Sequence, residues 1–285
     1  NAEYMGNVRP CKLHMTIPSP PYLLPFCHAP TVFTRRSLIL STTTYPLANT
    51  ANTSLQLPNT SITDRVFLDF SICPNFFRSE QESLSTLCTG SVPLGRLVIG
   101  LYGRLVPITV SNFKTMCTTG QYRNTVVHKI VPGQYFLAGR QGSSVKGEVI
   151  VKEPLRLTQN TEAVDSKAFE LKHSTGGIVS LSLAENDDED SAKFESNYRN
   201  VEFLITSGPD PCPELDKKNI VFGSVLEGMD VVAAIGSTPI FKPSERIRQL
   251  NDFARFLGDG KAKIARETWD KPLRSIFISD CGELP

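Results

Sequence analysis

The chain has 285 residues, of which 40% are hydrophobic and 21% charged, an ordinary composition for a globular protein. Its 30 basic and 29 acidic residues give a formal net charge of +1, which excludes the strongly basic surface typical of nucleic-acid binding. No uninterrupted apolar stretch approaches the roughly 20 residues that cross a bilayer. We therefore expect neither a nucleic-acid partner nor an integral membrane span.

Residues 1–62 differ in composition from the rest of the chain. No acidic residue lies between Glu3 and Asp64, and Ser, Thr, Pro and Asn abound there, as in a transit peptide. Inside this segment Arg35 and Arg36 precede a short apolar run and then small residues, a pattern that resembles a twin-arginine export signal. We predict a bipartite leader that directs the protein through a chloroplast into the thylakoid lumen. The alternative is a disordered tail with an accidental arginine pair.

Two cysteines flank a loop that reads CPNFFRSEQESLSTLC. In an oxidising compartment Cys73 and Cys88 would close this loop with a disulfide worth up to ~3 kcal/mol, but we expect two free thiols. After the leader, the sequence has neither a CxxC motif nor a Cys/His pair at the spacing of zinc ligands. We therefore expect no metal site.

Short strand-like segments separated by turns follow the leader. RVFLDFSI at 65–72 and GRLVIGLY at 95–102 place apolar side chains at alternate positions, the period of half-buried antiparallel strands. A helix is predicted at 110–118, with Thr109 as its cap and Gly120 as its stop. Later segments predict a second short helix, EGMDVVAAI, and further strands, VVHKIV, GGIVSLSLA, VEFLITSG, NIVFGSVLEG and RSIFISDCG. Many strands with two helices favour a closed or nearly closed barrel with helices over its ends.

A helical segment at about 243–270 lies between the second short helix and the last strand. Ser244 is a candidate cap, and a helical stripe is formed by Ile247, Leu250, Phe253 or Ala254, and Leu257. Gly258 and Gly260 separate this helix from a second helical run. We expect a hairpin that packs on the barrel and buries its stripe; the alternative is an appendage that docks a partner.

Taken together and in order, several motifs resemble the cyclophilin family of peptidyl-prolyl isomerases. They span residues 65–284 and read GRLVIGLYGRLVPITVSNFKTMCTTG, HKIVPG, LKHSTGGIVSLS, LDKKNIVFGSVLEGMDVV and ISDCGEL. The resemblance implies a mainly β fold at 63–285, a closed eight-stranded antiparallel β-barrel with two capping helices and a proline-binding groove on one face. The helical segment is an extra insertion. With the leader, the chain resembles a thylakoid-lumen member from a plant chloroplast.

The resemblance also implies a chemistry. Rotation about a prolyl bond faces a barrier of roughly 18 to 20 kcal/mol because amide resonance must be lost. In this family an apolar slot holds the proline ring beside an arginine whose guanidinium favours the twisted amide. Catalysis is then differential stabilisation of a conformational transition state, and no cofactor is implied.

The catalytic strand of this chain departs from the family's pattern. Active members read roughly HRxxPxFMxQGGD, whereas residues 128–140 read HKIVPGQYFLAGR, which places Lys129 at the arginine. Lysine keeps the positive charge but loses the planar, bidentate guanidinium. Lys129 is therefore a weak candidate for the catalytic cation. Gln134 and Tyr135 stand at the pocket Phe and Met, and Leu137 stands at the substrate-binding Gln.

Four further substrate-binding positions follow downstream. Ser182 stands where substrate backbone is held, Leu204 replaces a pocket phenylalanine of the QFF motif, and Asn219 stands at a histidine position. Leu215 matches the family, but Glu214 replaces the tryptophan before it. The segments that build the groove thus diverge, while those that build the barrel remain recognisable.

Because function depends on the site and not on the fold, two hypotheses stay open. The first is a weak, specialised prolyl isomerase that acts on proline-containing polypeptide segments with Lys129 as its cation. The second is a binding or assembly protein that holds a partner, such as part of a membrane complex. It would do so through the altered groove, an acidic run at 185–190 or the helical insertion. We predict an isomerase-class protein of weak or absent intrinsic activity that assists folding or assembly.

Overall fold

The computed structural model describes residues 58–76, 88, 90–151, 155, 157–183, 199–266 and 268–285. Most of the predicted leader and the acidic run at 185–190 lie outside these residues. Within the described ranges, no helix is both long enough and apolar enough to span a membrane.

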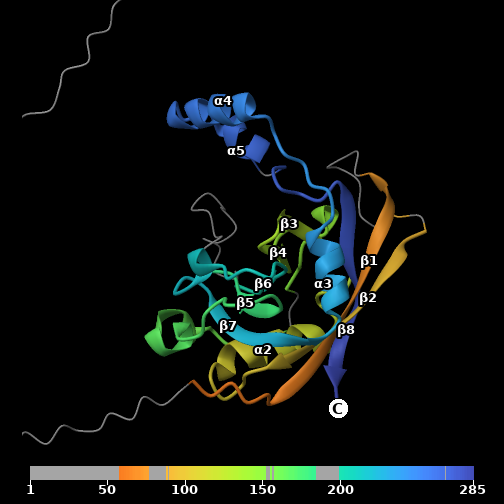
Figure 1. The fold of residues 1–285 in the computed structure, drawn as a ribbon, viewed down its shortest axis with the longest axis vertical. Coiled ribbons are helices and arrows are strands. Elements are labelled where there is room, and N and C mark those ends of the chain that lie inside the picture. Colours follow the sequence, from red (N-terminus) through yellow and green to blue (C-terminus); the bar gives the residue numbers. More distant parts are fainter. Residues whose placement is uncertain are drawn as a thin grey trace, which may run out of the picture. The chain divides into compact units, whose positions relative to one another are not determined.

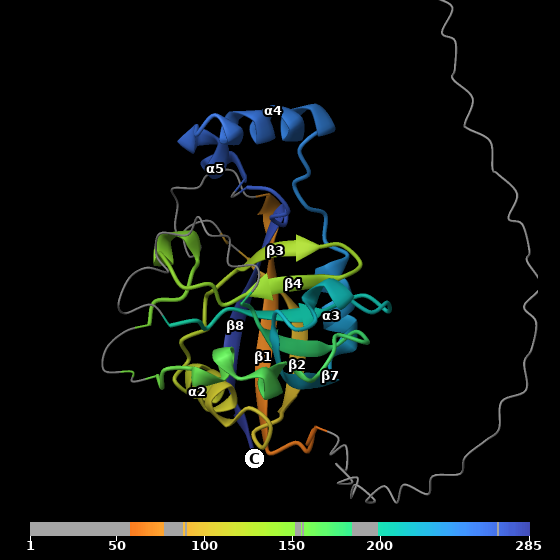
Figure 2. The ribbon, with the colours of Figure 1, turned by 90° about the vertical axis from the view of Figure 1, so that its left-hand side faces the viewer.

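Eight strands form one antiparallel sheet that nearly closes into a barrel (Figures 1 and 2). Their order in the sheet is β3-β4-β6-β5-β7-β2-β1-β8. The ends of this order meet where Val126, just before β3, pairs with Phe277 of β8, and the Ile278 N–H donates to the Thr125 carbonyl at 2.9 Å. The predicted eight-stranded antiparallel barrel is confirmed. The strands are β1 (Asp64–Phe76), β2 (Val92–Leu101), β3 (Val127–Val131), β4 (Tyr135–Ala138), β5 (Ile178–Leu181), β6 (Phe203–Thr206), β7 (Ile220–Glu227) and β8 (Arg274–Leu284).

The alternating pattern in the sequence sets the inner face of the barrel. In β1 the side chains of Val66, Leu68 and Phe70 are buried in the main core, and Leu97 and Ile99 of β2 join them. Successive side chains of a strand point to opposite faces, so every second residue fills the barrel. Figure 2 shows β3, β4 and β6 crossing in front of the long strands β1, β2 and β8.

Helices α2 (Pro107–Thr118) and α3 (Met229–Gly236) pack against the strands. The predicted first helix is correct at its C-terminal end, where Gly120 adopts a φ of 68° just beyond the cap Thr119. At its other end the prediction is wrong, because the helix begins at Pro107 and Thr109 lies inside it. Proline suits the first helical position because its φ is already helical and its missing N–H is not needed there.

The start of α2 is capped by a carboxylate from far along the chain. Buried Glu162 accepts hydrogen bonds from the N–H groups of Ile108 and Thr109, both at 2.8 Å, and from the Thr109 hydroxyl at 2.6 Å. Glu162 itself lies in a short 3-10 helix, η2 (Thr161–Val164). A negative charge at a helix N-terminus satisfies free N–H donors and interacts favourably with the helix dipole.

Removing this cap should weaken the fold. We expect Glu162→Ala to lower the free energy of unfolding by about 2 kcal/mol, because it leaves two helix N–H groups and a buried hydroxyl without their acceptor. Urea denaturation measures the change. The exposed Glu227, at the end of β7, provides the matched control: Glu227→Ala should stay within about 0.5 kcal/mol of the parent. Equal effects of the two substitutions would contradict a capping role for Glu162.

The helical insertion forms a hairpin of α4 (Glu245–Phe256) and α5 (Gly260–Arg266). Ser244 does occupy the N-cap position, although its side chain makes no capping hydrogen bond. The expectation that the hairpin buries its stripe is wrong. Ile247, Leu250 and Phe253 are 52%, 62% and 62% exposed. The stripe is apolar, but no described part of the barrel covers it.

The expectation of free thiols at Cys73 and Cys88 is also wrong, because the structure joins them in a disulfide. Their Cα atoms are 5.4 Å apart, within the range that a disulfide spans. Cys73 lies in β1, and both cysteines pack with Phe277 and Val126 where the barrel closes. The two cysteines come together only in the folded chain, so their spacing in the sequence alone did not predict the disulfide.

Candidate functional site

The candidate site lies on the outer face of the sheet formed by β3, β4, β6 and β5. Strand register places Lys129 opposite Leu137, Leu137 opposite Leu204, and Leu204 opposite Ser180. The adjacent row, Ile130, Phe136, Ile205 and Val179, is buried in the main core. Because strand side chains alternate between faces, the first row points away from the core and forms the floor of the candidate groove.

Most of this floor is buried beneath a turn. Tyr135, Leu137 and Leu204 are 5%, 1% and 0% exposed, and they form a separate apolar cluster with Cys212 and Leu215. The last two belong to the turn that carries the 3-10 helix η5 (Pro213–Leu215). Four predicted slot residues are thus brought together, but they pack on one another. An apolar slot needs exposed floor for a proline ring, and these side chains offer almost none.

The other predicted site residues lie around this cluster. Gln134 is exposed at the β3–β4 turn, where its carbonyl accepts from the N–H groups of Ser207 and Gly208 at 2.7 and 3.3 Å. Lys129 is half-buried beside Leu137 in the strand register. The structure therefore places Lys129, the candidate catalytic cation, at the edge of a packed apolar cluster.

Ser182 and Asn219 are fully buried and tie loops together. The Ser182 N–H donates to the Glu202 carbonyl at 2.9 Å, and the Asn200 side chain donates to the Ser182 carbonyl at 2.6 Å. Asn219 accepts from the Leu183 N–H at 2.8 Å and donates to the Leu215 carbonyl at 3.4 Å. In this arrangement the Asn219 amide holds the turn over the cluster.

A buried histidine and carboxylate beside Lys129 were missed by sequence reasoning. A β-bulge in β3 makes His128 the extra residue between Val127 and Lys129. Its Nε2 lies 2.6 Å from Oε1 of Glu202, and both side chains are largely buried. Glu202 stands at the first position of the QFF-like motif, so a carboxylate that only accepts replaces an amide that also donates. A single acidic residue in the apolar run VEFLIT was the available signal.

A second histidine holds the turn from the other side. His173 Nδ1 lies 2.9 Å from Asp216 Oδ1, and its Nε2 lies 2.7 Å from Ser180 Oγ. The three residue types match a hydrolytic triad, but His173 and Ser180 are 1% and 0% exposed, so no substrate reaches the hydroxyl. The His173 carbonyl also accepts from the Cys212 N–H at 2.8 Å. The network joins β5 to the turn that carries Leu215.

This network predicts a loss of stability in mild acid. Burial lowers the pKa of His173 below 6.5, more than neighbouring Asp216 raises it. The unfolded chain therefore binds this proton more readily than the folded one, so stability is full above pH 6.5 and falls as the pH drops below it. We expect that His173→Gln flattens this part of the stability profile, measured by urea denaturation across pH. An unchanged slope in the variant would assign the acid sensitivity to other groups.

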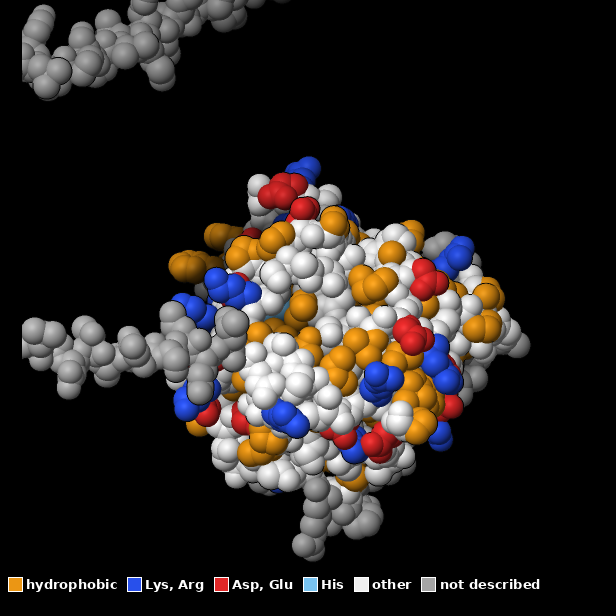
Figure 3. All heavy atoms as spheres, turned by 60° about the horizontal axis from the view of Figure 1, so that its bottom comes forward, with side chains coloured by type: hydrophobic (Ala, Val, Ile, Leu, Met, Phe, Trp, Pro, Cys, Tyr) orange, Lys and Arg blue, Asp and Glu red, His pale blue; other side chains and the backbone are white. Residues whose placement is uncertain are grey.

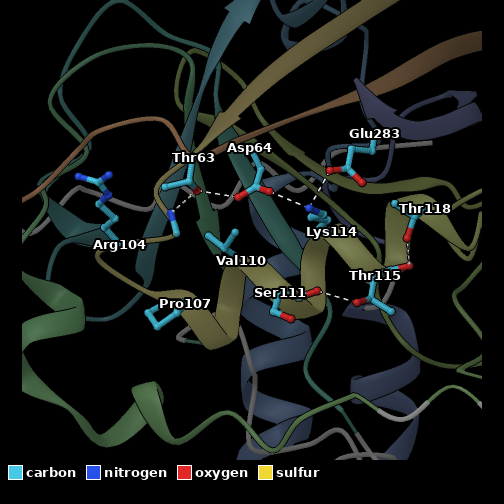
Figure 4. A pocket seen from close by; sticks show the side chains of 11 residues that line it. Thr63, Asp64, Arg104, Pro107, Val110, Ser111, Lys114, Thr115, Thr118 and Glu283 are labelled. Carbon is cyan, nitrogen blue, oxygen red and sulfur yellow. Dashed lines mark hydrogen bonds and ion pairs between the residues drawn. The ribbon is translucent and has the colours of Figure 1, made fainter. Parts of the chain in front are cut away.

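A separate pocket of about 420 Å³ is lined by α2, the start of β1 and the end of β8 (Figure 4). Lys114 of α2 points into it and pairs with Asp64 and Glu283, each at 2.7 Å. The hydrogen bond from Lys114 lowers the pKa of Asp64, and the bond to Asp64 raises that of Lys114. These charges satisfy one another and tie α2 to β1 and β8, so we read the pocket as structural. Within the described residues, no group of three or more His, Cys, Asp or Glu side chains is placed to hold a metal ion.

A comparison with protein families gives one match over much of the chain. The model described as cyclophilin type peptidyl-prolyl cis-trans isomerase/CLD matches residues 85–251. The match includes the strands that carry Lys129, Leu137 and Leu204.

Individual relatives agree with that match. The chain is 60% identical over 233 residues to a chloroplastic peptidyl-prolyl cis-trans isomerase, CYP28 of Arabidopsis thaliana, covering 80% of this chain and 83% of the relative. It is 28% identical over 200 residues to peptidyl-prolyl cis-trans isomerase B of Saccharomyces cerevisiae, covering 68% and 75%. Peptidyl-prolyl cis-trans isomerase D of the same yeast is 32% identical over 149 residues, covering 50% and 57%.

Proposed function

The chain belongs to the cyclophilin-type peptidyl-prolyl cis-trans isomerase family, and on that premise we propose that it assists protein folding or assembly with weak or absent intrinsic isomerase activity. The burial of the slot carries this proposal. Tyr135 and Leu204, which stand at pocket positions of the family, are 5% and 0% exposed and pack against the turn at Leu215. A proline ring would have to displace this turn to reach them.

The charge beside the slot supports the same proposal. Lys129 supplies a compact ammonium where the family's mechanism uses a planar guanidinium, so it cannot hold a substrate amide through two parallel hydrogen bonds. Glu202, just before β6, adds a buried carboxylate that pairs with His128, the residue before Lys129. The site therefore lacks the donor geometry that stabilises a twisted amide.

A binding or assembly protein is the second candidate function. The filled slot favours it, because a barrel that cannot seat a proline ring can still hold a partner on other surfaces. If the protein acts as an isomerase, the proposed partners are proline-containing polypeptide segments. If it acts as an assembly protein, the proposed partner is a component of a membrane complex.

For location we propose the chloroplast and, within it, the thylakoid lumen. The chloroplastic relative supports the organelle. The lumen is supported by the leader, in which Glu3 is the one acidic residue and Arg35 and Arg36 form the arginine pair, and by the Cys73–Cys88 disulfide, since disulfides persist in oxidising compartments. Fractionation of isolated chloroplasts with a tagged full chain tests this location. Recovery of the protein only in the stroma would contradict the lumenal part.

The functional proposal is tested by two measurements on the same sample. Exchange NMR follows cis-trans isomerisation of a short proline peptide, while amide shifts of the protein report whether the peptide binds. We expect little acceleration and little or no shift at Tyr135 and Leu137. Strong acceleration would overturn the weak-activity proposal, and peptide binding without acceleration would select the second candidate.

A further inference from the structure

The hairpin of α4 and α5 stands apart from the barrel on a short stalk, on the side of β3 (Figures 1 and 2). Its two connecting segments pair with each other, since the Phe241 N–H donates to the Lys271 carbonyl at 2.9 Å and the Asp270 N–H donates to Phe241 at 3.0 Å. The Asp270 carbonyl accepts from the Ile130 N–H of β3 at 2.9 Å. The stalk thus attaches to the strand that carries Lys129.

The face of α4 that meets α5 is polar. Buried Asn251 donates to the Ala262 carbonyl at 2.9 Å and accepts from Arg266 Nε at 2.7 Å. Arg266 also pairs with Asp252. At the base of the hairpin, the guanidinium carbons of Arg248 and Arg266 lie 5.8 and 5.4 Å from the ring centre of Trp269. These contacts hold α4 to α5 through the polar face of α4, so the apolar face of α4 points away from α5.

That apolar side is a continuous stripe along α4, which we call the α4 stripe. At about 100° per residue, its members fall within an arc of about 120°. They are 52% to 66% exposed: Ile247, Leu250, Phe253 and Leu257. Phe256, at the end of the helix, is 85% exposed. On the face in Figure 3, orange side chains form several groups with blue and red side chains among them. A contiguous exposed stripe indicates an interaction surface.

Charge around the stripe indicates what it contacts. On the helical wheel Arg246 falls inside the same arc, whereas Glu245 and Asp252 fall on the opposite side. The hairpin segment 245–266 has six basic and three acidic residues, a net charge of +3, although the whole chain carries only +1. Exposed Phe, Leu and Ile beside arginine, on a helix of low overall hydrophobicity, are the features of a helix that lies in a membrane interface.

We propose that α4 binds the surface of an anionic lipid bilayer, with the α4 stripe at the boundary between head groups and acyl chains and Arg246 at the lipid phosphates. This binding is independent of isomerase activity. It would hold the barrel at a membrane surface, with the stalk and the adjoining β3 close to the lipid.

Vesicle flotation with the full chain tests the proposal. We expect the protein to float with vesicles of phosphatidylcholine and phosphatidylglycerol, to bind pure phosphatidylcholine much less, and to be released by high salt. The double variant Leu250→Ser/Phe253→Ser should lose at least roughly tenfold in partitioning, because two exposed apolar side chains no longer enter the lipid. Arg246→Gln should reduce partitioning onto anionic vesicles roughly fivefold and leave partitioning onto pure phosphatidylcholine unchanged.

A matched control removes two exposed apolar side chains outside the hairpin. Val145→Ser/Val164→Ser, at residues 46% and 90% exposed, should bind vesicles like the parent. All variants alter exposed positions, so their thermal unfolding midpoints should match the parent's. The proposal is overturned if anionic vesicles do not retain the protein, or if the α4 variants bind them as well as the control does. Self-association without lipid that Leu250→Ser/Phe253→Ser abolishes would assign the stripe to a second copy instead.

Discussion

We expect this protein to isomerise a short proline peptide with a kcat/KM at least ~10²-fold lower than that of a cyclophilin that keeps arginine at the catalytic position. Losing one preorganised donor to a transition state typically costs about 10² to 10³ in rate. Here Lys129 replaces that donor, and the slot residues Leu137 and Leu204 are also buried. Both the charge geometry and the apolar floor are therefore altered.

Restoring the arginine separates these two causes. Because the slot is filled, we expect Lys129→Arg to change kcat/KM by less than about threefold, and Lys129→Ala to have a similarly small effect. Lys167→Arg, at an exposed position, controls for an added guanidinium. If Lys129→Arg alone raises kcat/KM by about 10²-fold, the slot admits proline and only the cation was missing. If the parent is active and Lys129→Ala abolishes that activity, lysine itself is the working cation.

Removing the disulfide is expected to have the largest effect on stability. Cys73→Ser/Cys88→Ser should lower the free energy of unfolding by about 3 kcal/mol, because the cross-link restricts the unfolded chain across a separation of 15 residues. The effect reaches the point where the barrel closes, since both cysteines pack with Phe277 and Val126. Urea denaturation under non-reducing conditions measures it.

Chemical reduction gives an independent check of the same bond. Reductant should destabilise the parent by a similar amount and leave the double variant unchanged. The cysteines at 117, 212 and 281 are buried free thiols, so reduction should not affect them. Maleimide labelling of Cys73 and Cys88 in the folded parent without reductant would contradict the disulfide.

Much of the fold could be predicted from the sequence because local patterns reflect local geometry. Alternation in RVFLDFSI identified the inward side chains Val66, Leu68 and Phe70, and Gly120 marked the end of α2. The candidate site was also found from the sequence, since the resemblance placed Lys129, Leu137 and Leu204 at catalytic or substrate-binding positions of the family. The structure sets them in one row across three neighbouring strands.

Other features depended on groups that are distant in the sequence. The start of α2 is set by Glu162, more than fifty residues away, and not by Thr109 as local capping rules predicted. Cys73 and Cys88 meet where Phe277 of β8, about 190 residues farther along the chain, packs beside them. The pairing of His128 with Glu202 depends on the bulge in β3, where His128 is the extra residue, and on the start of β6 lying close to that bulge.

The contrast between the slot and the α4 stripe shows where sequence information ends for this protein. Sequence identified apolar side chains in both places and predicted a diverged groove and a covered stripe, but it did not predict that Leu137 is buried or that Leu250 is exposed. Periodicity determines which face of a strand or helix is apolar. Whether that face meets water depends on which other element packs over it, and only the tertiary structure decides this, because burial is a property of the assembled chain.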